Sequence, residues 1–245
     1  MANIVQGGYT VYGYDIGVLM LDSEFPRVIG DIGNAKTWGF PVLYETVKGF
    51  KPEKVVLKLD MNDIEPFIEA AQRLERKGVK AITTSCGFLA MFQRELVQRI
   101  SIPVFTSALV MLPMLCKMAG KVLVLSANSD TLTQRHLEAA CGDLSLLDYK
   151  VIGTQNEANF TDFTVYNWSQ VDTDLCEREI LSVLHKELDY DKSYKCILLE
   201  CTNLPPYSDA IRKEFGLPVF DIVTLMNFVH SSMDMNFFEN GYRTC

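Results

Sequence analysis

The chain has 245 residues, of which 48% are hydrophobic and 22% are charged, and its formal net charge is −8. This composition is typical of a folded globular protein with a sizeable core. The negative charge argues against a nucleic-acid partner, because phosphate binding needs clustered Lys and Arg. The longest apolar runs, such as residues 107–116, are short and interrupted by proline, so we expect no membrane span.

The amino terminus and the cysteines indicate the compartment. Residues 1–8 contain no basic segment followed by an apolar stretch, which predicts a cytoplasmic protein without a signal peptide. The seven cysteines include no CxxC pair, and we expect neither a disulfide framework nor a metal site. Most of them are expected to be small buried hydrophobic residues.

Short apolar runs alternate with helical patterns along the chain. Unbroken Val, Ile and Leu runs between helices indicate parallel sheets that are covered on both faces, so the fold class is α/β. Helices are expected at 63–77, 130–140 and 174–188, where apolar residues recur at three- and four-residue spacing. The predicted strands are 18–21, 55–59, 80–84, 103–105, 122–125, 149–152, 196–199 and 218–220.

The two halves of the chain repeat each other at a fixed offset of 115 residues. Cys86 and Cys201 each lie 17 residues before a Pro-Val-Phe sequence, at 103–105 and 218–220, and Lys80 matches Lys195 at the same offset. The openings of the halves also correspond, with 19–22 aligned on 123–126. The repeat predicts two similar lobes, each a four-stranded parallel sheet flanked by helices. We assign 1–107 with 221–245 to the first lobe and 108–220 to the second.

Each half places one cysteine directly after its third predicted strand. In open parallel sheets, ligands bind beyond the carboxyl ends of the strands. Two facing lobes related by a pseudo-twofold axis would therefore bring Cys86 and Cys201 to opposite walls of one interlobe cleft. A helix amino terminus beside each sulfur is expected to favour the thiolate.

Two thiols on opposite faces of one carbon form an acid–base pair. One thiolate removes the Cα proton and the other thiol returns a proton to the opposite face, which inverts a stereocentre without a cofactor. The carbanion-like intermediate needs hydrogen-bond donors, although Ser, Thr and Asn at such turns are also common N-caps. The candidate substrate-binding residues near the predicted strand ends are Thr84, Ser85, Gly87, Ser126, Asn128, Thr202 and Asn203.

A long aromatic and glycine-containing segment follows the first predicted strand, from 22 to 41. Loops of this length without periodicity are usually functional or disordered, and this composition favours a functional loop. Arg27 is a candidate partner for a substrate carboxylate, because guanidinium can bind both oxygens, or else a solvated arginine. We expect Arg27, or the turn from Gly30 to Asn34, to close over the substrate.

The cysteine motifs resemble those of the aspartate/glutamate racemase superfamily. Cys201-Thr-Asn-Leu-Pro205 is similar to the Cys-Thr-x-x-Pro motif around the second cysteine, and 83–88 looks like the first-cysteine motif of the hydantoin racemase branch. Residues 127–131 lie where many members carry Ala-Thr-x-x-Thr, and Asp22-Ser23 lies where glutamate racemases carry Asp-Ser. The resemblance implies a cofactor-independent isomerase with two catalytic cysteines, and makes Asp22 a further binding candidate.

Three positions depart from the pattern of these racemases. Gly87 replaces the Asn that glutamate racemases place after the first cysteine, and Glu200 replaces the usual Gly before the second. Asn203 stands where glutamate racemases have His and aspartate racemases have Glu, which weakens the case for either substrate. None of the three histidines is expected to be catalytic by position.

The leading hypothesis is an amino-acid racemase or epimerase acting on a small molecule with a carboxylate. A hydantoin racemase, or a cysteine-dependent isomerase or decarboxylase similar to maleate isomerase or arylmalonate decarboxylase, is the alternative within the same fold. A two-lobed binding protein without chemistry is the alternative from another class. A homo-oligomer is compatible with any of these hypotheses.

Overall fold

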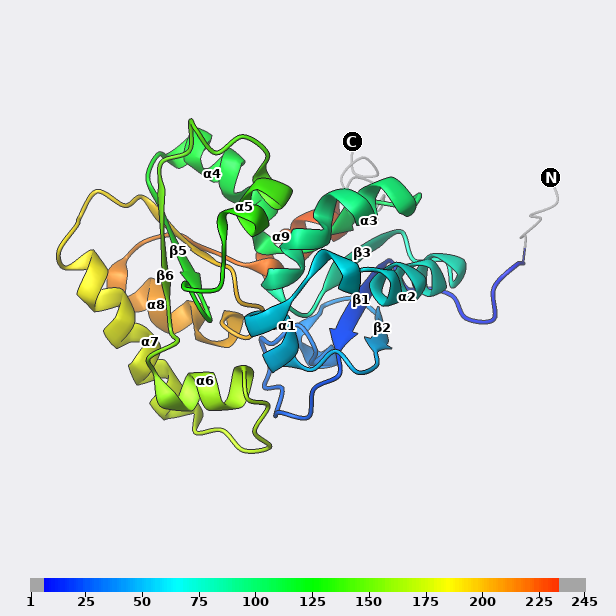
Figure 1. Cartoon of the computed structure of the whole chain (residues 1–245), viewed down its shortest axis with the longest axis horizontal. Coiled ribbons are helices and arrows are strands. Elements are labelled where there is room, and N and C mark those ends of the chain that lie inside the picture. Colours follow the sequence, from blue (N-terminus) through cyan, green and yellow to red (C-terminus); the bar gives the residue numbers. More distant parts are fainter. Residues whose placement is uncertain (1–6, 234–245) are drawn as a thin grey trace, which may run out of the picture.

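Two separate parallel sheets organise the chain in the computed structural model, which describes residues 7–233 (Figure 1). The first sheet has the order β2 (Val42–Val47), β1 (Ile16–Leu21), β3 (Ala81–Thr84) and β4 (Val104–Phe105). The second has the order β6 (Tyr149–Gly153), β5 (Val122–Ser126), β7 (Cys196–Leu199) and β8 (Val219–Phe220). The predicted α/β fold of two similar lobes is confirmed.

The two sheets repeat each other in their hydrogen bonds as well as in their strand order. Ile82 N donates to the Pro103 carbonyl and Ile197 N to the Pro218 carbonyl, both at 2.9 Å, at the predicted offset of 115 residues. Directly after β3, Ser85 N donates to the Leu19 carbonyl, and directly after β7, Glu200 N donates to the Leu125 carbonyl, both at 2.8 Å. Leu19 therefore corresponds to Leu125, and the sequence alignment of 19–22 with 123–126 was wrong by two residues.

Helices cover both sheets (Figure 1). The helices predicted at 63–77, 130–140 and 174–188 correspond to α2 (Glu65–Arg76), α5 (Gln134–Cys141) and α7 (Thr173–Leu188). The helix α5 begins at Gln134 because Thr133 caps it. Short 3-10 helices are η1 (Ala35–Thr37), η2 (Met61–Asp63), η3 (Gly87–Phe92), η4 (Ala108–Met111) and η5 (Pro205–Tyr207). The α-helices of the described residues are α1 (Pro52–Lys58), α2 (Glu65–Arg76), α3 (Gln93–Arg99), α4 (Leu112–Ala119), α5 (Gln134–Cys141), α6 (Ala158–Thr164), α7 (Thr173–Leu188), α8 (Ser208–Phe215) and α9 (Ile222–Ser231).

One predicted strand is a helix. Residues 55–59 fall mainly in α1, which begins at Pro52, a residue well suited to a first helical turn. An apolar run this short fits a buried helix as well as a strand, and periodicity alone does not separate the two. The second strand is instead β2, whose residues, apart from Val47, are all partly exposed.

The hydrophobic core crosses from one lobe to the other. Alternate side chains of β5 and β7 point to opposite faces of the second sheet. Val124 and Leu198 pack with the core around the first sheet, whereas Leu125 and Leu199 pack with α7 and α8. The division of the chain at 107/108 and 220/221 stays a prediction. The segment 221–245 that it assigns to the first lobe includes residues 234–245, which lie outside the described residues.

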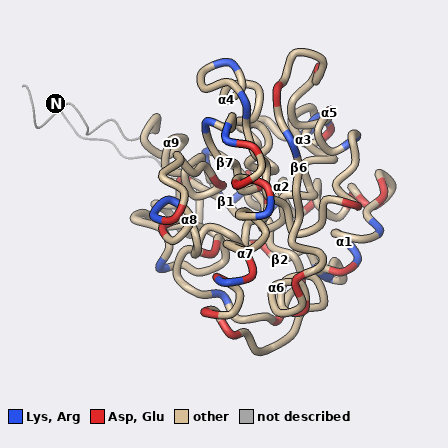
Figure 2. Tube along the Cα trace, turned by 90° about the vertical axis from the view of Figure 1, so that its left-hand side faces the viewer, with Lys and Arg blue, Asp and Glu red and all other residues tan. Residues whose placement is uncertain are grey.

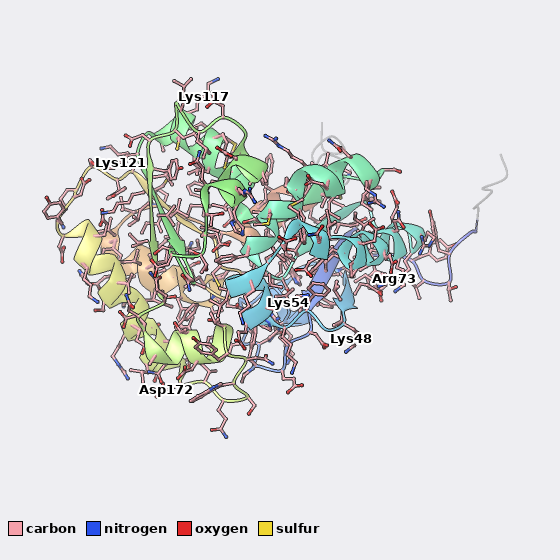
Figure 3. All side chains as sticks on the ribbon, viewed as in Figure 1. Lys48, Lys54, Arg73, Lys117, Lys121 and Asp172 are labelled. Carbon is pink, nitrogen blue, oxygen red and sulfur yellow. The ribbon has the colours of Figure 1, made fainter. Side chains whose placement is uncertain are left out.

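Charged residues of both signs are interspersed along the trace (Figure 2). Three of the lysines labelled in Figure 3, Lys48, Lys54 and Lys121, form ion pairs with the aspartates Asp22, Asp63 and Asp191. Between residues 7 and 233, no helix has the length and apolar character that crossing a membrane requires. Residues 1–6, which bear on the signal-peptide prediction, lie outside the described part.

Candidate active site

Cys86 and Cys201 line one narrow pocket, which has a cavity volume of about 20 Å³ and opens partly to solvent. Cys86 follows β3 and precedes η3, and Cys201 follows β7. Both thiols are free, and they are 9% and 8% exposed. The structure thus brings together the two cysteines that the sequence repeat paired, while their catalytic role stays a prediction.

The two thiols have raised pKa values but unequal surroundings. Burial, and next the Glu200 carboxylate, raise the pKa of Cys86 to about 12, while the N–H groups of Phe88 and Leu89 and the Arg27 charge lower it. Burial and Glu200 also raise the pKa of Cys201 well above its usual value, and Asp31 raises it further. The expectation that helix termini would favour both thiolates was wrong, because burial outweighs the short 3-10 turn.

Glu200 lines the same pocket as the two thiols and is fully buried. Its Oε2 accepts a hydrogen bond from Ser126 Oγ at 2.7 Å, and its Oε1 has no partner among the described residues. Burial raises the pKa of Glu200 to about 7, and the bond from Ser126 lowers it. The carboxyl group therefore titrates in the neutral range.

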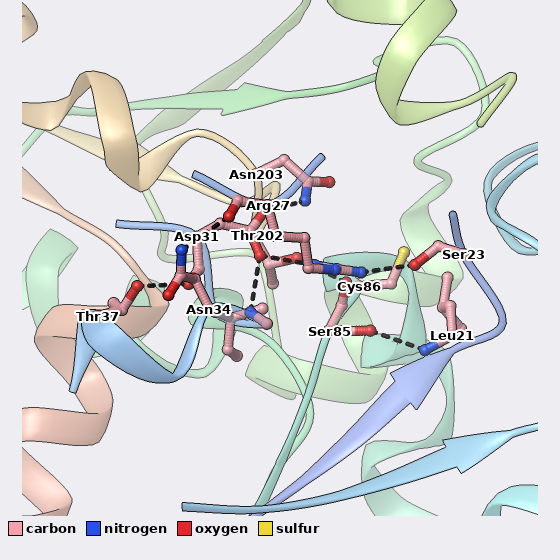
Figure 4. Close-up of polar contacts among 12 residues, drawn as sticks. Leu21, Ser23, Arg27, Asp31, Asn34, Thr37, Ser85, Cys86, Thr202 and Asn203 are labelled. Atoms are coloured by element: carbon pink, nitrogen blue, oxygen red, sulfur yellow. Dashed lines mark hydrogen bonds and ion pairs between the residues drawn. The ribbon is translucent and has the colours of Figure 1, made fainter. Parts of the chain in front are cut away.

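Arg27 is the cation among the residues that line the pocket, and a polar network fixes its direction (Figure 4). Its Nη1 donates to Asp31 Oδ1 at 2.7 Å and its Nη2 donates to Ser23 Oγ at 2.8 Å. The guanidinium carbon lies 4.5 Å from the centroid of the Phe25 ring. Arg27 is consequently not the solvated arginine of the alternative interpretation.

Two hydrogen bonds connect the turn after β7 to the first half of the chain (Figure 4). Thr202 Oγ1 donates to the Ser85 carbonyl at 2.7 Å. Asn203 Nδ2 donates to Asp31 Oδ2 at 2.6 Å. The first bond joins the two cysteine-bearing turns, and the second joins the turn of Cys201 to the loop that holds Asp31.

The rest of the pocket wall is mostly apolar. Side chains from the first strand, α1, the end of α6 and the turns after β3 and β5 contribute to it. They are Leu21, Phe25, Pro52, Val56, Phe88, Ala127, Thr164 and Val165. The pocket therefore combines one cationic side and a mostly apolar wall with the polar side chains of Ser85, Glu200, Thr202 and Asn203.

The structure places five of the predicted binding residues in the pocket wall, namely Arg27, Ser85, Gly87, Thr202 and Asn203. The other five lie outside the lining and have structural partners. Asp22 accepts from Lys48 and Gly49, Asn34 caps η1, Thr84 donates to the Thr106 carbonyl, Ser126 binds Glu200, and Asn128 accepts from the N–H groups of Asp130 and Thr131.

Glu200 is the ionisable residue of the pocket lining that was not among the predicted site residues. Its signal was a carboxylate directly before a cysteine at the end of a buried strand, where an ionisable group is unusual. The structure also places two of the three departures from the racemase motifs, Gly87 and Glu200, against each other. A Cβ on Gly87 would lie 2.0 Å from Glu200 Oε1, so the carboxylate occupies the space that a side chain at position 87 would need.

No cluster of three or more His, Cys, Asp or Glu side chains suited to a metal ion occurs within residues 7–233. His136 is buried against Phe88, with ring centroids 5.3 Å apart, and burial lowers its pKa to about 4. It lies outside the pocket lining, which fits the packing role expected from the sequence.

Residues 59–226 match the model of the Asp/Glu/hydantoin racemase family. The chain is also similar to dimethylsulfoniopropionate lyases 7 and 3 of Emiliania huxleyi, at 34% and 31% identity over 89% of its length. It spans 67% and 59% of the length of these relatives.

Among solved structures, the glutamate racemase isoform RacE1 from Bacillus anthracis superposes with a TM-score of 0.60. The superposition covers 94% of this chain and 83% of the racemase, at 18% identity. This likeness concerns the fold.

Proposed function

Because the chain belongs to the Asp/Glu/hydantoin racemase family, we propose that it uses the Cys86 thiolate to remove a proton beside a carboxylate, as a lyase acting on dimethylsulfoniopropionate or a similar β-sulfonio acid. The observation that carries the proposal is the unequal setting of the two thiols. Arg27 favours the thiolate of Cys86, whereas Asp31 disfavours that of Cys201. An elimination needs one base on one face of the substrate, and racemisation needs a matched pair.

Arg27 supplies the carboxylate site. Its guanidinium is held in place by Asp31 and Ser23 before any ligand arrives, so little side-chain entropy is lost on binding. A carboxylate bound there places its neighbouring carbon between the guanidinium and the thiols. The charge that develops on the carboxylate during proton removal is then stabilised by the same group.

The apolar wall suits a sulfonium group better than an ammonium group. An α-ammonium carries three N–H donors, and each needs an acceptor when it is buried. A dimethylsulfonium carries methyl groups and no donors, so contact with Val56, Phe88 and Val165 leaves no hydrogen bond unmade. The nearby Glu200 carboxylate offers the opposite charge.

The elimination balances with these residues alone. The Cys86 thiolate takes the C2 proton and becomes a thiol, and the C2–H electron pair forms the C2=C3 double bond. The C3–S bond breaks with its electrons moving to sulfur, which leaves as neutral dimethyl sulfide, and acrylate remains at Arg27. Cys201 stays a thiol, with its Sγ 3.7 Å from Asn203 Oδ1.

The test is release of dimethyl sulfide, measured by headspace gas chromatography, together with acrylate measured by NMR. We expect Cys86→Ser to lower turnover by about 100-fold or more, since a serine hydroxyl is a poor base at neutral pH. Cys201→Ser should keep a measurable rate. Absence of dimethyl sulfide with the unmodified protein would refute the lyase assignment.

Amino-acid racemisation is the second candidate, because the two thiols occupy equivalent turns of the two repeats. In this case Cys86→Ser and Cys201→Ser should both abolish activity. Chiral chromatography of aspartate, glutamate and hydantoins in deuterated water distinguishes the two reactions. A racemase gives deuterated product of inverted configuration and no acrylate.

A further inference from the structure

The pocket that Cys86 and Cys201 line is too narrow to hold a substrate. Its cavity volume of about 20 Å³ has room for roughly one water molecule. A small carboxylic acid with a second charged group is several times larger than a water molecule. One section of the wall must therefore move before such a molecule reaches Cys86.

A much larger hollow, which we call the outer cavity, adjoins this pocket and has a volume of about 510 Å³. Val56 of α1 lines both the pocket and the outer cavity. Phe88 of η3 lines the pocket, and its ring lies edge-on to the ring of His136, which lines the outer cavity. The side chains of Val56 and Phe88 therefore form part of the wall between the outer cavity and Cys86.

This section of the wall is held by apolar contacts. Val56 and Phe88 have no polar side-chain atoms. His136 Nδ1 accepts from Thr133 N at 3.1 Å, so we assign the proton of the neutral ring to Nε2, which has no partner among the described residues. Movement of the Phe88 ring away from His136 therefore breaks no side-chain hydrogen bond.

The wall on the side of α6 is tied more firmly. Glu24 N donates to Asn167 Oδ1 at 2.7 Å, which joins the loop after β1 to the loop after α6. Phe25 lines the pocket, packs edge-on against Phe163 at a centroid distance of 5.3 Å, and contacts the guanidinium of Arg27. Movement of this side would break a hydrogen bond and displace the ring that contacts Arg27.

The lining of the outer cavity indicates what it would bind. Val55 and Met91 are buried and give it an apolar inner side. Asp130 and Arg135 line it from exposed positions and supply one charge of each sign. A small molecule that carries both a carboxylate and a cationic group matches this combination.

We propose that the outer cavity is the site where a small zwitterionic carboxylate first binds, and that the molecule then reaches Cys86 by passing between Val56 and Phe88. The Phe88 ring moves aside from His136 to admit it and returns afterwards. The inference rests on the proposed function only in naming the class of substrate.

The test compares the rates at which a small and a bulky neutral reagent, iodoacetamide and N-phenylmaleimide, alkylate Cys86, followed by peptide mass spectrometry. Both reagents attack the thiolate, so the ratio of the bulky to the small rate cancels changes in thiolate fraction and reports the passage. His136→Ala should raise this ratio at least about threefold, because the Phe88 ring loses its aromatic contact and moves aside more easily. Asn167→Ala, which removes the acceptor of Glu24 N on the α6 side, is the matched control and should leave the ratio unchanged.

A second pair of variants obstructs the two sides instead of opening them. Gln134 is exposed and lines the outer cavity, so Gln134→Trp should lower the ratio. Gln170 is exposed in the loop after α6, and Gln170→Trp should leave the ratio unchanged. If His136→Ala fails to fold by circular dichroism, the comparison of these two variants decides.

Two results would overturn the proposal. An unchanged ratio in a folded His136→Ala protein would show that the wall formed by Val56 and Phe88 does not limit access to Cys86. A ratio that rises as much in Asn167→Ala as in His136→Ala would place the entrance beside α6. The measurement uses no substrate, so a missing dimethyl sulfide signal together with the expected ratios would reject the lyase and leave the entrance in place.

Discussion

At the scale of single residues, Arg27 is held more firmly than a loop arginine usually is. The carboxylate of Asp31, the hydroxyl of Ser23 and the ring of Phe25 all contact its guanidinium. The exposed fraction of its side chain is 13%. The guanidinium group is therefore oriented before substrate binds. Its planar shape allows Nη1 and Nη2 to donate to Asp31 and Ser23 at the same time.

We expect Arg27→Lys to raise KM by about tenfold or more and to change kcat less, because an ammonium cannot replace both N–H bonds to Asp31 and Ser23 and still bind a carboxylate. Steady-state kinetics with dimethylsulfoniopropionate measures the two constants separately. Arg94→Lys is the matched control, since Arg94 is exposed and outside the pocket lining. Equal KM values in the two variants would return Arg27 to a structural role.

Glu200 should also make folding stability depend on pH. Its pKa is raised from 4.5 to about 7 in the folded state, so the folded protein binds more protons than the unfolded chain between these values. Stability from this group is present below about pH 4.5 and is lost as the pH rises through 7. The expected loss is about 3 kcal/mol.

Urea unfolding at about pH 5 and about pH 8 measures this difference. Glu200→Gln should remove most of it, because glutamine does not titrate. Glu177→Gln, an exposed position on α7, should leave it unchanged. If the free energy of unfolding depends on pH equally in Glu200→Gln and Glu177→Gln, ionisation of Glu200 does not destabilise the folded protein.

At the scale of elements, the turns after β3 and β7 are joined directly. The bond from Thr202 to the Ser85 carbonyl links residues 117 positions apart, and both ends are buried. The two cysteines adjoin these same residues. The alignment of the thiols therefore depends on a contact between turns rather than on either turn alone.

Thr202→Val should lower the free energy of unfolding by about 1–3 kcal/mol, because it leaves the buried Ser85 carbonyl unpaired without changing the side-chain volume much. Turnover should fall as well, since the cysteine-bearing turns lose their link. Thr202→Ser keeps the hydroxyl and serves as the control. Denaturant unfolding and turnover are both measured. A Thr202→Val protein with unchanged stability and unchanged turnover would show that this bond does not align the cysteine-bearing turns.

Buried, unbroken apolar strands are the elements that the sequence predicts best. β5 and β7 were found because nearly all of their residues are Ile, Val or Leu. β2 was missed because it is an edge strand with polar positions, and α1 was mistaken for a strand because its valines are consecutive. The bond between Asp31 and Asn203 spans 172 residues, and no local pattern predicts it.

The same limits explain the errors at the site. Burial decides the pKa of Cys86 and of Cys201, and burial follows from packing that the sequence does not show. Asp22 and Asn128 have suitable side chains at strand ends, but nearby backbone N–H groups use them. Both side chains have local structural partners, and their role in substrate binding stays a prediction.

At the scale of the whole molecule, the two lobes share a core, because one face of the second sheet packs with the residues around the first. Separating the lobes would expose Val122, Val124 and Leu198 to water. We therefore expect the lobes to unfold together in a single transition.

Trp168→Phe tests this expectation, because it leaves Trp38 in the first half as the sole tryptophan. Trp38 is buried and reports on its surroundings, whereas far-UV circular dichroism reports on the helices of both lobes. The two signals should give the same midpoint in thermal unfolding. Midpoints that differ would show that the lobes unfold independently.

The two sheets have the same strand order, but the segment between β1 and β2 differs from the segment between β5 and β6. In the first half this connection holds Arg27 and Asp31, whereas in the second half it holds α5. The thiols belong to the part of the molecule that repeats, and the charges that distinguish them belong to a part that does not. Substitutions in the first connection can therefore change the charges around the thiols while the repeated sheets keep the cysteine pair in place.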